Sequence, residues 1–180
     1  MKHVHVRAPQ LQTARLTLRA HGADDLDAVA AMWGDPAVVR HISGTPSTRE
    51  ECWGRVLRYA GLWSVRGYGY WAAEETATGR FVGDVGVADF ARDMTPALYD
   101  VPEAGWAISP AAQGRGYATE AMQAVLAWAD ANIDAPRVTC ILDETNAASL
   151  NVARKCGFGE YGRATYKGNP ALLWERTRGG

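Results

Sequence analysis

The sequence predicts a single α/β domain of the α+β kind, in which one mixed sheet is flanked by helices. At 180 residues the chain has the length of one domain, and 47% apolar with 22% charged residues is typical of a globular core. Strand-like and helix-like segments follow one another in the order β-α-α-β-β-β-α-β-α-β-β, with no linker, internal repeat or low-complexity tract. We expect the domain to cover residues 11–178, after a frayed terminus at residues 1–10.

The first half of the chain predicts a strand, two helices and a hairpin. Residues 15–19 alternate polar and apolar side chains, as a half-buried strand does, and residues 24–33 place apolar side chains at helical spacing before Gly34-Asp35-Pro36 ends the helix. A second helix is predicted over residues 48–65, since its acidic start and basic end suit the helix dipole. Two strand-like runs follow, joined as a hairpin across residues 76–79. These runs cover residues 68–74 and 81–90.

The second half predicts a loop, four strands and two helices. The loop covers residues 91–102. The strands are predicted at residues 103–108, 137–142, 160–166 and 172–177, and the helices at residues 117–132 and 146–156.

Charge and composition exclude several classes of function. A formal net charge of −1 offers no field for nucleic acid or an anionic membrane, and no apolar run approaches the ~20 residues of a membrane span. Three widely spaced cysteines without metal-site spacing indicate free thiols, so we expect a cytoplasmic protein without a metal. His3 and His5 would have to bind a metal from the frayed terminus, which is unfavourable.

The most informative stretch is a glycine turn, residues 113–118, between a strand and an amphipathic helix. Gly114 and Gly116 let the backbone approach a ligand without a Cβ in the way. The free amides of the following helix point into the same space, and the helix dipole adds positive potential. Such a site suits a pyrophosphate.

Three interpretations of this turn compete. It is a strand-to-helix turn without a ligand, a dinucleotide site, or a different phosphate site. A dinucleotide fold needs G-x-G-x-x-G after the first strand, whereas here Glu120 stands close to where the third glycine belongs and the turn lies late in the chain.

The third interpretation rests on a resemblance. Gln113-Gly114-Arg115-Gly116-Tyr117-Ala118 resembles the Q/R-x-x-G-x-G/A motif with which the GNAT acetyltransferase superfamily binds the pyrophosphate of acetyl-CoA. Residues 146–158 resemble the N-x-x-S helix and K-x-G-F motif of the branch that contains ribosomal-protein N-terminal acetyltransferases. Residues 13–19 are similar to the first strand of that branch, so the resemblance covers residues 11–176.

The resemblance implies the fold and the cofactor site. The sheet would be mostly antiparallel, with a splayed pair of strands forming the slot for acetyl-CoA. Backbone groups of Trp106, Ala107 and Ile108 would bind the pantetheine arm, and amides of residues 113–118 would bind the phosphates. Arg115 is either an added charge at this site or a solvated turn residue. Asn146 is either a cofactor contact or the N-cap of the later helix.

The catalytic residues are expected at the start of the cofactor-binding strand and on the later helix. An amine must lose a proton to attack the thioester, and Glu103 is the predicted base because the family often has a glutamate there; a surface charge is the alternative. The tyrosine acid of many family members is replaced by Ala153. Ser149 is the predicted substitute, with Tyr161 or Tyr166 as further choices. Glu120 is expected to cap helix amides or complement the dipole instead.

The acceptor is the least determined part of the prediction. Its pocket is expected between residues 40–46, 91–101 and 167–170, in an acidic region that suits a cationic amine or is simply solvated. We predict an amine acceptor, with a peptide N-terminus favoured over a small molecule such as a polyamine or antibiotic, in a monomer or homodimer. The rivals are a non-catalytic acyl-CoA-binding sensor and, more remotely, a dinucleotide-binding protein.

Overall fold

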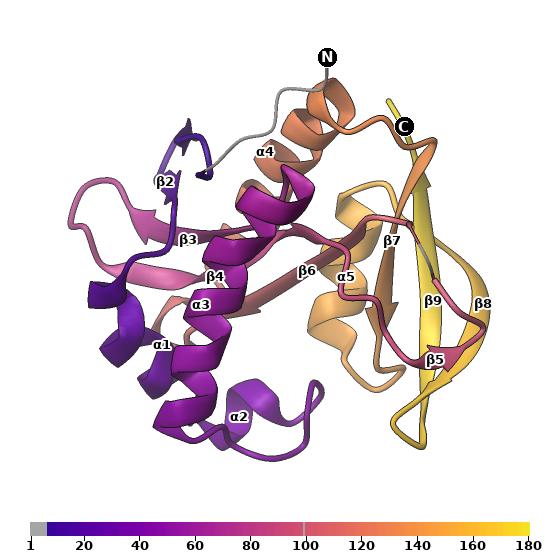
Figure 1. Cartoon of the computed structure of the whole chain (residues 1–180), viewed down its shortest axis with the longest axis horizontal. Helices are drawn as coiled ribbons and strands as arrows, with labels where there is room; N and C mark the ends of the chain where they lie inside the picture. Colours follow the sequence, from indigo (N-terminus) through magenta and orange to yellow (C-terminus); the bar gives the residue numbers. More distant parts are fainter. Residues whose placement is uncertain (1–6, 99) are drawn as a thin grey trace.

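The computed structural model describes residues 7–98 and 100–180, which form one nine-stranded sheet with helices on both faces (Figure 1). The strands run in the spatial order β1-β2-β3-β4-β6-β7-β9-β8-β5. Their bounds are β1 Leu11–Gln12, β2 Leu16–Arg19, β3 Tyr70–Glu75, β4 Phe81–Ala88, β5 Met94–Thr95, β6 Glu103–Ile108, β7 Arg137–Leu142, β8 Gly159–Tyr166 and β9 Asn169–Thr177. The α-helices are α1 Leu26–Trp33, α2 Pro36–Val39, α3 Arg49–Arg66, α4 Tyr117–Asn132 and α5 Ala147–Lys155.

Neighbouring strands are antiparallel everywhere except between β6 and β7, which are parallel. The predicted mixed, mostly antiparallel sheet is therefore confirmed. The hairpin of β3 and β4 lies where the sequence places it, with Gly79 in the left-handed region (φ +70°) that its turn requires.

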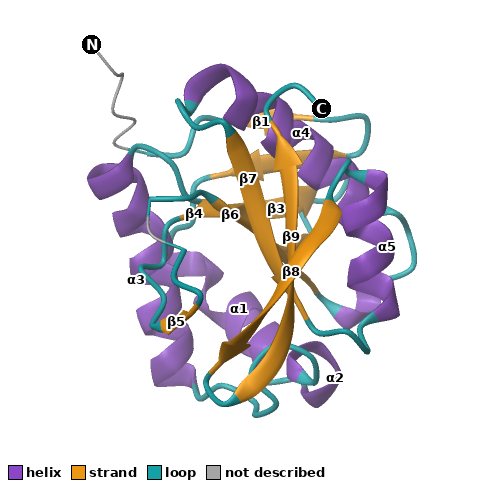
Figure 2. Cartoon of the chain, turned by 90° about the vertical axis from the view of Figure 1, so that its right-hand side faces the viewer, coloured by secondary structure: helices purple, strands orange, loops and turns teal. Residues whose placement is uncertain are grey.

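Helices cover the two faces of the sheet separately. Figure 2 shows α1 and α3 on one side and α4 and α5 on the other. On the first side, α1, α2 and α3 bury apolar side chains together with Ala107 of β6. On the second side, the buried stripe of α4 packs against β4 and β6. That stripe consists of Tyr117, Ala121, Met122, Val125, Leu126 and Ala129.

Side-chain caps fix the starts of α3 and α5. The Thr48 hydroxyl accepts from the Glu51 amide at 3.2 Å, and Glu51 Oε2 accepts from the Thr48 amide at 2.7 Å, which is a capping box. Asn146 Oδ1 accepts from the Ser149 amide at 3.1 Å. Helix α4, in contrast, begins after Gly116 with no side-chain cap, so its first amides remain available to a ligand.

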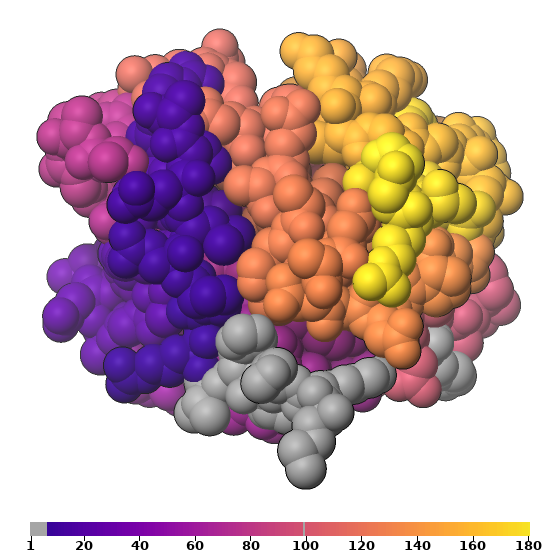
Figure 3. Space-filling view, turned by 90° about the horizontal axis from the view of Figure 1, so that it is seen from above, coloured from indigo at the N-terminus to yellow at the C-terminus, as the bar shows by residue number. Residues whose placement is uncertain are grey.

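Segments near both ends of the described chain contact α4, and in Figure 3 the indigo and yellow segments flank it. Glu120 accepts from the Thr13 hydroxyl at 2.6 Å and from the Arg15 amide at 2.8 Å. Asp130 pairs with both terminal nitrogens of Arg176, at 2.9 and 2.8 Å. Glu120 thus joins α4 to residues 13–15. The sequence predicts that Glu120 caps amides of its own helix, but it instead accepts from the backbone amide of Arg15.

Several details differ from the sequence prediction. The predicted loop at residues 91–102 contains β5, which pairs with β8, and the predicted helix stop at Pro36 is also the start of α2. Proline fits there because it occupies the first helical turn, where its missing N–H costs nothing. Residues 1–6 lie outside the described part, including His3 and His5. Of the residues expected to fray, Pro9 instead accepts a hydrogen bond from Trp71 Nε1 at 2.7 Å.

Cys52, Cys140 and Cys156 are buried thiols without a disulfide. In the described part of the chain, no helix combines the length and the apolar character that crossing a membrane requires.

Candidate active site

The centre of the candidate site is the point where β6 and β7 separate. The two strands are paired only at Glu103 and Thr139, where the Thr139 amide donates to the Pro102 carbonyl at 2.9 Å. Beyond this point β6 continues along β4, and β7 continues along β9. The edge of β6 that includes Trp106, Ala107 and Ile108 therefore keeps backbone groups that β7 does not satisfy. This is the splayed pair that the resemblance implies, and its free edge can bind an extended ligand.

The glycine turn lies at the far end of β6. Gly114 and Gly116 have φ of +73° and +78°, a region in which other residues are strained. A Cβ on Gly114 would meet nothing within 4 Å, and one on Gly116 would meet only Arg15 Nη2 at 3.5 Å, so the space above their amides is open. Gln113 keeps the turn folded by donating from Nε2 to the Ile108 carbonyl at 2.9 Å. An open cradle of amides at an uncapped helix start fits a pyrophosphate.

An ionic cluster around Glu75 lies beside this turn and binds two of its residues, Arg115 and Tyr117. Arg115 Nη1 and Arg80 Nη2 bond to Glu75 Oε1 at 2.6 and 2.7 Å, and the Tyr117 hydroxyl donates to the same oxygen at 2.8 Å. Hydrogen bonds from Arg80, Tyr117 and Thr78 lower the pKa of Glu75 to about 2. Arg115 is thus an exposed turn residue whose guanidinium is paired with Glu75. It is anchored beside the turn, and its carbonyl also accepts from Arg15 Nη1.

Glu103 is buried at the start of β6 and forms a bidentate pair with Arg92. Arg92 Nε donates to Oε2 and Nη2 to Oε1, both at 2.6 Å, while Nη1 donates to the Tyr166 hydroxyl at 2.9 Å. Burial opposes the charge of Arg92, but the bonds to Glu103 outweigh it and raise the Arg92 pKa above its usual value. Glu103 is therefore not a free surface charge. Arg92 was not identified from the sequence, because the loop that carries it has no pattern linking it to β6.

The later helix places Ser149 and Asn146 together at its start. Asn146 is the N-cap, as one of its two sequence interpretations requires, and Ser149 is half-buried in the first turn. Position 153 is a fully buried alanine, so the helix offers no phenol there. Of the two alternative acids, Tyr161 is exposed beside Arg137, whereas Tyr166 is bonded to Arg92 and hence linked to Glu103.

The predicted acidic region is largely neutralised. Arg66 Nη2 lies 2.9 Å from Asp89 and 3.1 Å from Asp100, and Arg92 pairs with Glu103. The sequence places four acidic residues here, Asp89, Asp93, Asp100 and Glu103, and Asp89, Asp100 and Glu103 thus have an arginine partner. This arrangement weakens the attraction of the region for a polycation.

A buried polar group near the site, which is centred on Asp84, was also not identified from the sequence. Asp84 of β4 is fully buried, and it accepts from Trp33 Nε1 at 2.7 Å and lies 2.8 Å from His21 Nε2. It joins β4 to α1 and to the segment after β2. No sequence signal pairs these three residues, which are up to 63 positions apart.

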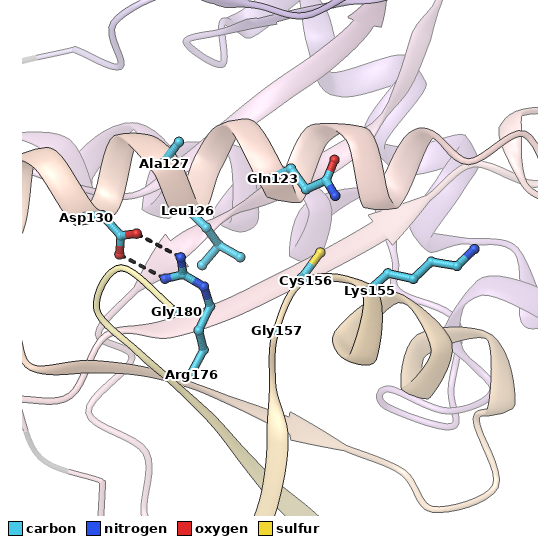
Figure 4. Close-up of a pocket in the computed structure, with 9 residues that line it drawn as sticks. All are labelled: Gln123, Leu126, Ala127, Asp130, Lys155, Cys156, Gly157, Arg176 and Gly180. Carbon is cyan, nitrogen blue, oxygen red and sulfur yellow. Dashed lines mark hydrogen bonds and ion pairs between the residues drawn. The ribbon is translucent and has the colours of Figure 1, made fainter.

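One cavity lies apart from the glycine turn, between the C-terminal half of α4 and the ends of α5 and β9 (Figure 4). Its volume is about 340 Å³, and the Asp130–Arg176 pair closes one end while Cys156 and Lys155 lie at the other. The Cys156 thiol contacts the Thr119 carbonyl at 4.0 Å, and burial raises its pKa to about 11, which makes it unreactive. Among residues 7–98 and 100–180, no cluster of three or more side chains suited to a metal ion occurs.

Comparisons with known proteins agree with this geometry. The family described as "Acetyltransferase (GNAT) domain" matches residues 15–159. The curated protein YkkB of Bacillus subtilis, whose function is uncharacterized, is 29% identical over 174 residues, which cover 93% of this chain and 95% of YkkB. A solved structure described as a GnaT-family acetyltransferase from Bordetella pertussis is 30% identical, with a TM-score of 0.82 over 94% of this chain and all of that one.

More distant structures share the fold. RimL, a ribosomal L7/L12 α-N-protein acetyltransferase solved with coenzyme A, is 18% identical with a TM-score of 0.76, over 94% of this chain and 98% of RimL. A spermidine N-acetyltransferase from Vibrio cholerae, solved with CoA and spermine, is 17% identical with a TM-score of 0.71, over 91% and 95% of the two chains.

The family match spans most of the chain, and the splayed strands and the uncapped glycine turn lie within the matched segment. The chain belongs to the GNAT acetyltransferase family.

Proposed function

We propose that this acetyltransferase uses acetyl-CoA as its donor and transfers the acetyl group directly to a primary amine in a ternary complex. The observation that carries the donor is the combination of the open amide cradle at Gly114 and Gly116 with the unpaired edge of β6. The phosphates would contact residues 113–118, and the pantetheine arm would extend along Trp106, Ala107 and Ile108. From Ile108 back to Glu103 the strand spans roughly 17 Å, at about 3.3 Å per residue, which an extended arm can follow.

The chemistry then takes place near the pairing point of β6 and β7. The amine nitrogen forms a bond to the acetyl carbon, the carbon–sulfur bond breaks, and the amine loses one proton while the thiolate gains one. Glu103 is the proposed proton acceptor. Arg92 engages one lone pair on each carboxylate oxygen, and a second lone pair on each remains for a water or an amine. Ser149 is the proposed donor to the thiolate, with Tyr166 as the alternative.

The proposed acceptor is an exposed α-amine, with a peptide N-terminus favoured over a polyamine. An α-amino group has a pKa ~2 units below that of lysine, so a single base deprotonates it more easily. The arginine partners of Asp89, Asp100 and Glu103 remove much of the negative charge that would attract a polycation. RimL acts on a protein α-amine and the Vibrio enzyme on spermidine, so the fold serves either kind of acceptor.

An amine panel tests the proposal. Thiol release from acetyl-CoA is measured with peptides that have free or blocked α-amines, with spermidine and with an aminoglycoside. We expect activity that requires the free α-amine. Activity confined to the small amines would overturn the acceptor assignment. Binding of acetyl-CoA without thiol release from any amine would favour the non-catalytic sensor.

A further inference from the structure

Tyr70 of β3 lies across two glycine positions of the neighbouring strands. Tyr70 pairs with Gly86 of β4, and Gly86 pairs with Gly105 of β6. A Cβ on Gly86 would come within 2.8 Å of Tyr70 Cδ2, and a Cβ on Gly105 would come within 2.1 Å of the Tyr70 hydroxyl oxygen. Because the two glycines have no side chains, the Tyr70 ring can lie across them, with its hydroxyl over Gly105 of β6.

The ring is held in this position by other aromatic side chains. Tyr59 of α3 stacks on it with a centroid separation of 4.5 Å and an angle of 6°, and Phe90 contacts it at 5.8 Å. Only 7% of Tyr70 is exposed. A ring fixed by packing keeps its hydroxyl at one place, as a group that binds a substrate must.

The hydroxyl has no hydrogen-bond partner among the described residues. The side-chain polar atoms that are both fully buried and unpartnered are His21 Nδ1, Arg55 Nε and Trp174 Nε1, so the Tyr70 oxygen retains some access to solvent. Burial, with smaller effects of Tyr59 and Glu103, raises the pKa of Tyr70 well above 10. The phenol stays protonated and neutral, and it has an unused acceptor and an unused donor.

Its location is close to the proposed reaction centre. Glu103 and Gly105 are two residues apart on β6, so they face the same side of the sheet. Ala107, two residues further, packs against α1 and α3 on that side. Gly105 also belongs to the part of β6 that is not paired with β7. The Tyr70 hydroxyl and the Glu103–Arg92 pair thus lie above the same strand, on the side of the sheet opposite α4 and α5.

We propose that the Tyr70 hydroxyl contacts the acceptor amine, accepting a hydrogen bond from its N–H and directing the nitrogen lone pair toward the thioester. This inference rests on the proposed acetyl transfer to an amine. A neutral oxygen beside a carboxylate that Arg92 already neutralises does little to favour the ammonium form, which cannot attack.

The first test is Tyr70→Phe, with Tyr59→Phe as the matched control. Phenylalanine keeps the stack and removes an oxygen that has no partner among the described residues, so the thermal midpoint and the acetyl-CoA affinity should not change. With the most active amine of the panel, kcat/KM for the amine should fall about 10-fold or more, the expected cost of a lost hydrogen bond to a reacting group. Tyr59→Phe removes a hydroxyl that bonds to Arg55 and should leave kcat/KM for the amine unchanged.

The second test uses Gly105→Ala, which sets a Cβ against the Tyr70 hydroxyl. Alone, it should lower both the thermal midpoint and the activity. In Tyr70→Phe/Gly105→Ala the closest ring atom is Cζ at 3.3 Å, so the midpoint should recover while the activity stays low. Recovery of both would overturn the role of the hydroxyl.

The outcomes separate the two proposals. An active wild-type enzyme whose Tyr70→Phe variant has wild-type kcat/KM would overturn the role of Tyr70 alone. A wild-type protein that binds acetyl-CoA and acetylates no amine of the panel would overturn the proposed function, and this inference with it.

Discussion

Replacing Gly116 with valine tests whether the glycine turn holds acetyl-CoA. In the free protein a Cβ at this position would meet only Arg15 Nη2, at 3.5 Å, so crowding is small. The main effect on stability comes from the backbone, because a residue with a Cβ must adopt the left-handed conformation at φ +78°. This destabilises the folded state by about 1–2 kcal/mol. For a domain of this size that lowers the thermal midpoint by roughly 2–8 °C. The variant should therefore fold, but its side chain would fill the space that the phosphates need.

The assay is the thermal midpoint with and without acetyl-CoA. At a concentration about 100 times Kd, a ligand stabilises the native state by about 2.7 kcal/mol, which is roughly 5–11 °C here. We expect this shift in the wild type and its loss in Gly116→Val. Gly168→Val is the matched control, since Gly168 also has φ +78° and open space around it, but lies in the β8–β9 turn. It should lose similar stability and keep the shift. A folded Gly116→Val protein with the wild-type shift would refute the site.

Two further predictions concern acidic residues. Glu103→Gln should leave acetyl-CoA affinity intact and lower turnover roughly 10²-fold, as expected for loss of a general base; unchanged turnover with an unchanged pH profile would exclude that role. Glu75 has a pKa lowered from 4.5 to about 2, so its contribution to stability is complete above pH 4.5 and is lost as the pH falls toward 2. The thermal midpoint should fall over that range, and Glu75→Gln should make the fall shallower; equally steep profiles would contradict this.

Local sequence signals predicted most of the fold. Strand β6, helix α4 and strand β7 have the predicted bounds, because each is a clean periodic run between strong stop signals. Strand β5 was missed because two residues carry no period, and it exists only because β8 lies beside it. Helix α2 was missed because Pro36 was read as a stop, whereas Asp35 caps the new helix by accepting from the Ala37 amide.

The parts of the site that depend on local backbone conformation could be predicted from the sequence. The parts that depend on contacts between side chains far apart in the sequence, or carried by irregular loops, could not. The glycines at 114 and 116 and the N-cap role of Asn146 follow from local chemistry. The pairing of Arg92 with Glu103 spans 11 residues and depends on how an irregular loop folds back onto β6. Gly86 and Gly105 are a weaker signal that could have been used, since glycines in adjacent strands indicate a close approach over the sheet.

The Arg92–Glu103 pair leaves two roles for Glu103, proton acceptor or structural partner of Arg92, and Arg92→Met separates them. Removing the guanidinium leaves a largely buried carboxylate unpaired, which costs about 3 kcal/mol, the lower end for a buried pair because Arg92 is still 23% exposed. Adding Glu103→Gln to Arg92→Met removes that charge and should restore part of the lost stability. If Glu103 accepts the proton, Arg92→Met should retain turnover below its melting range, whereas every variant with Glu103→Gln is slow. If Glu103 only holds Arg92 in place, turnover in all three variants should follow the folded fraction, and the base must be sought among waters or other residues of the cleft.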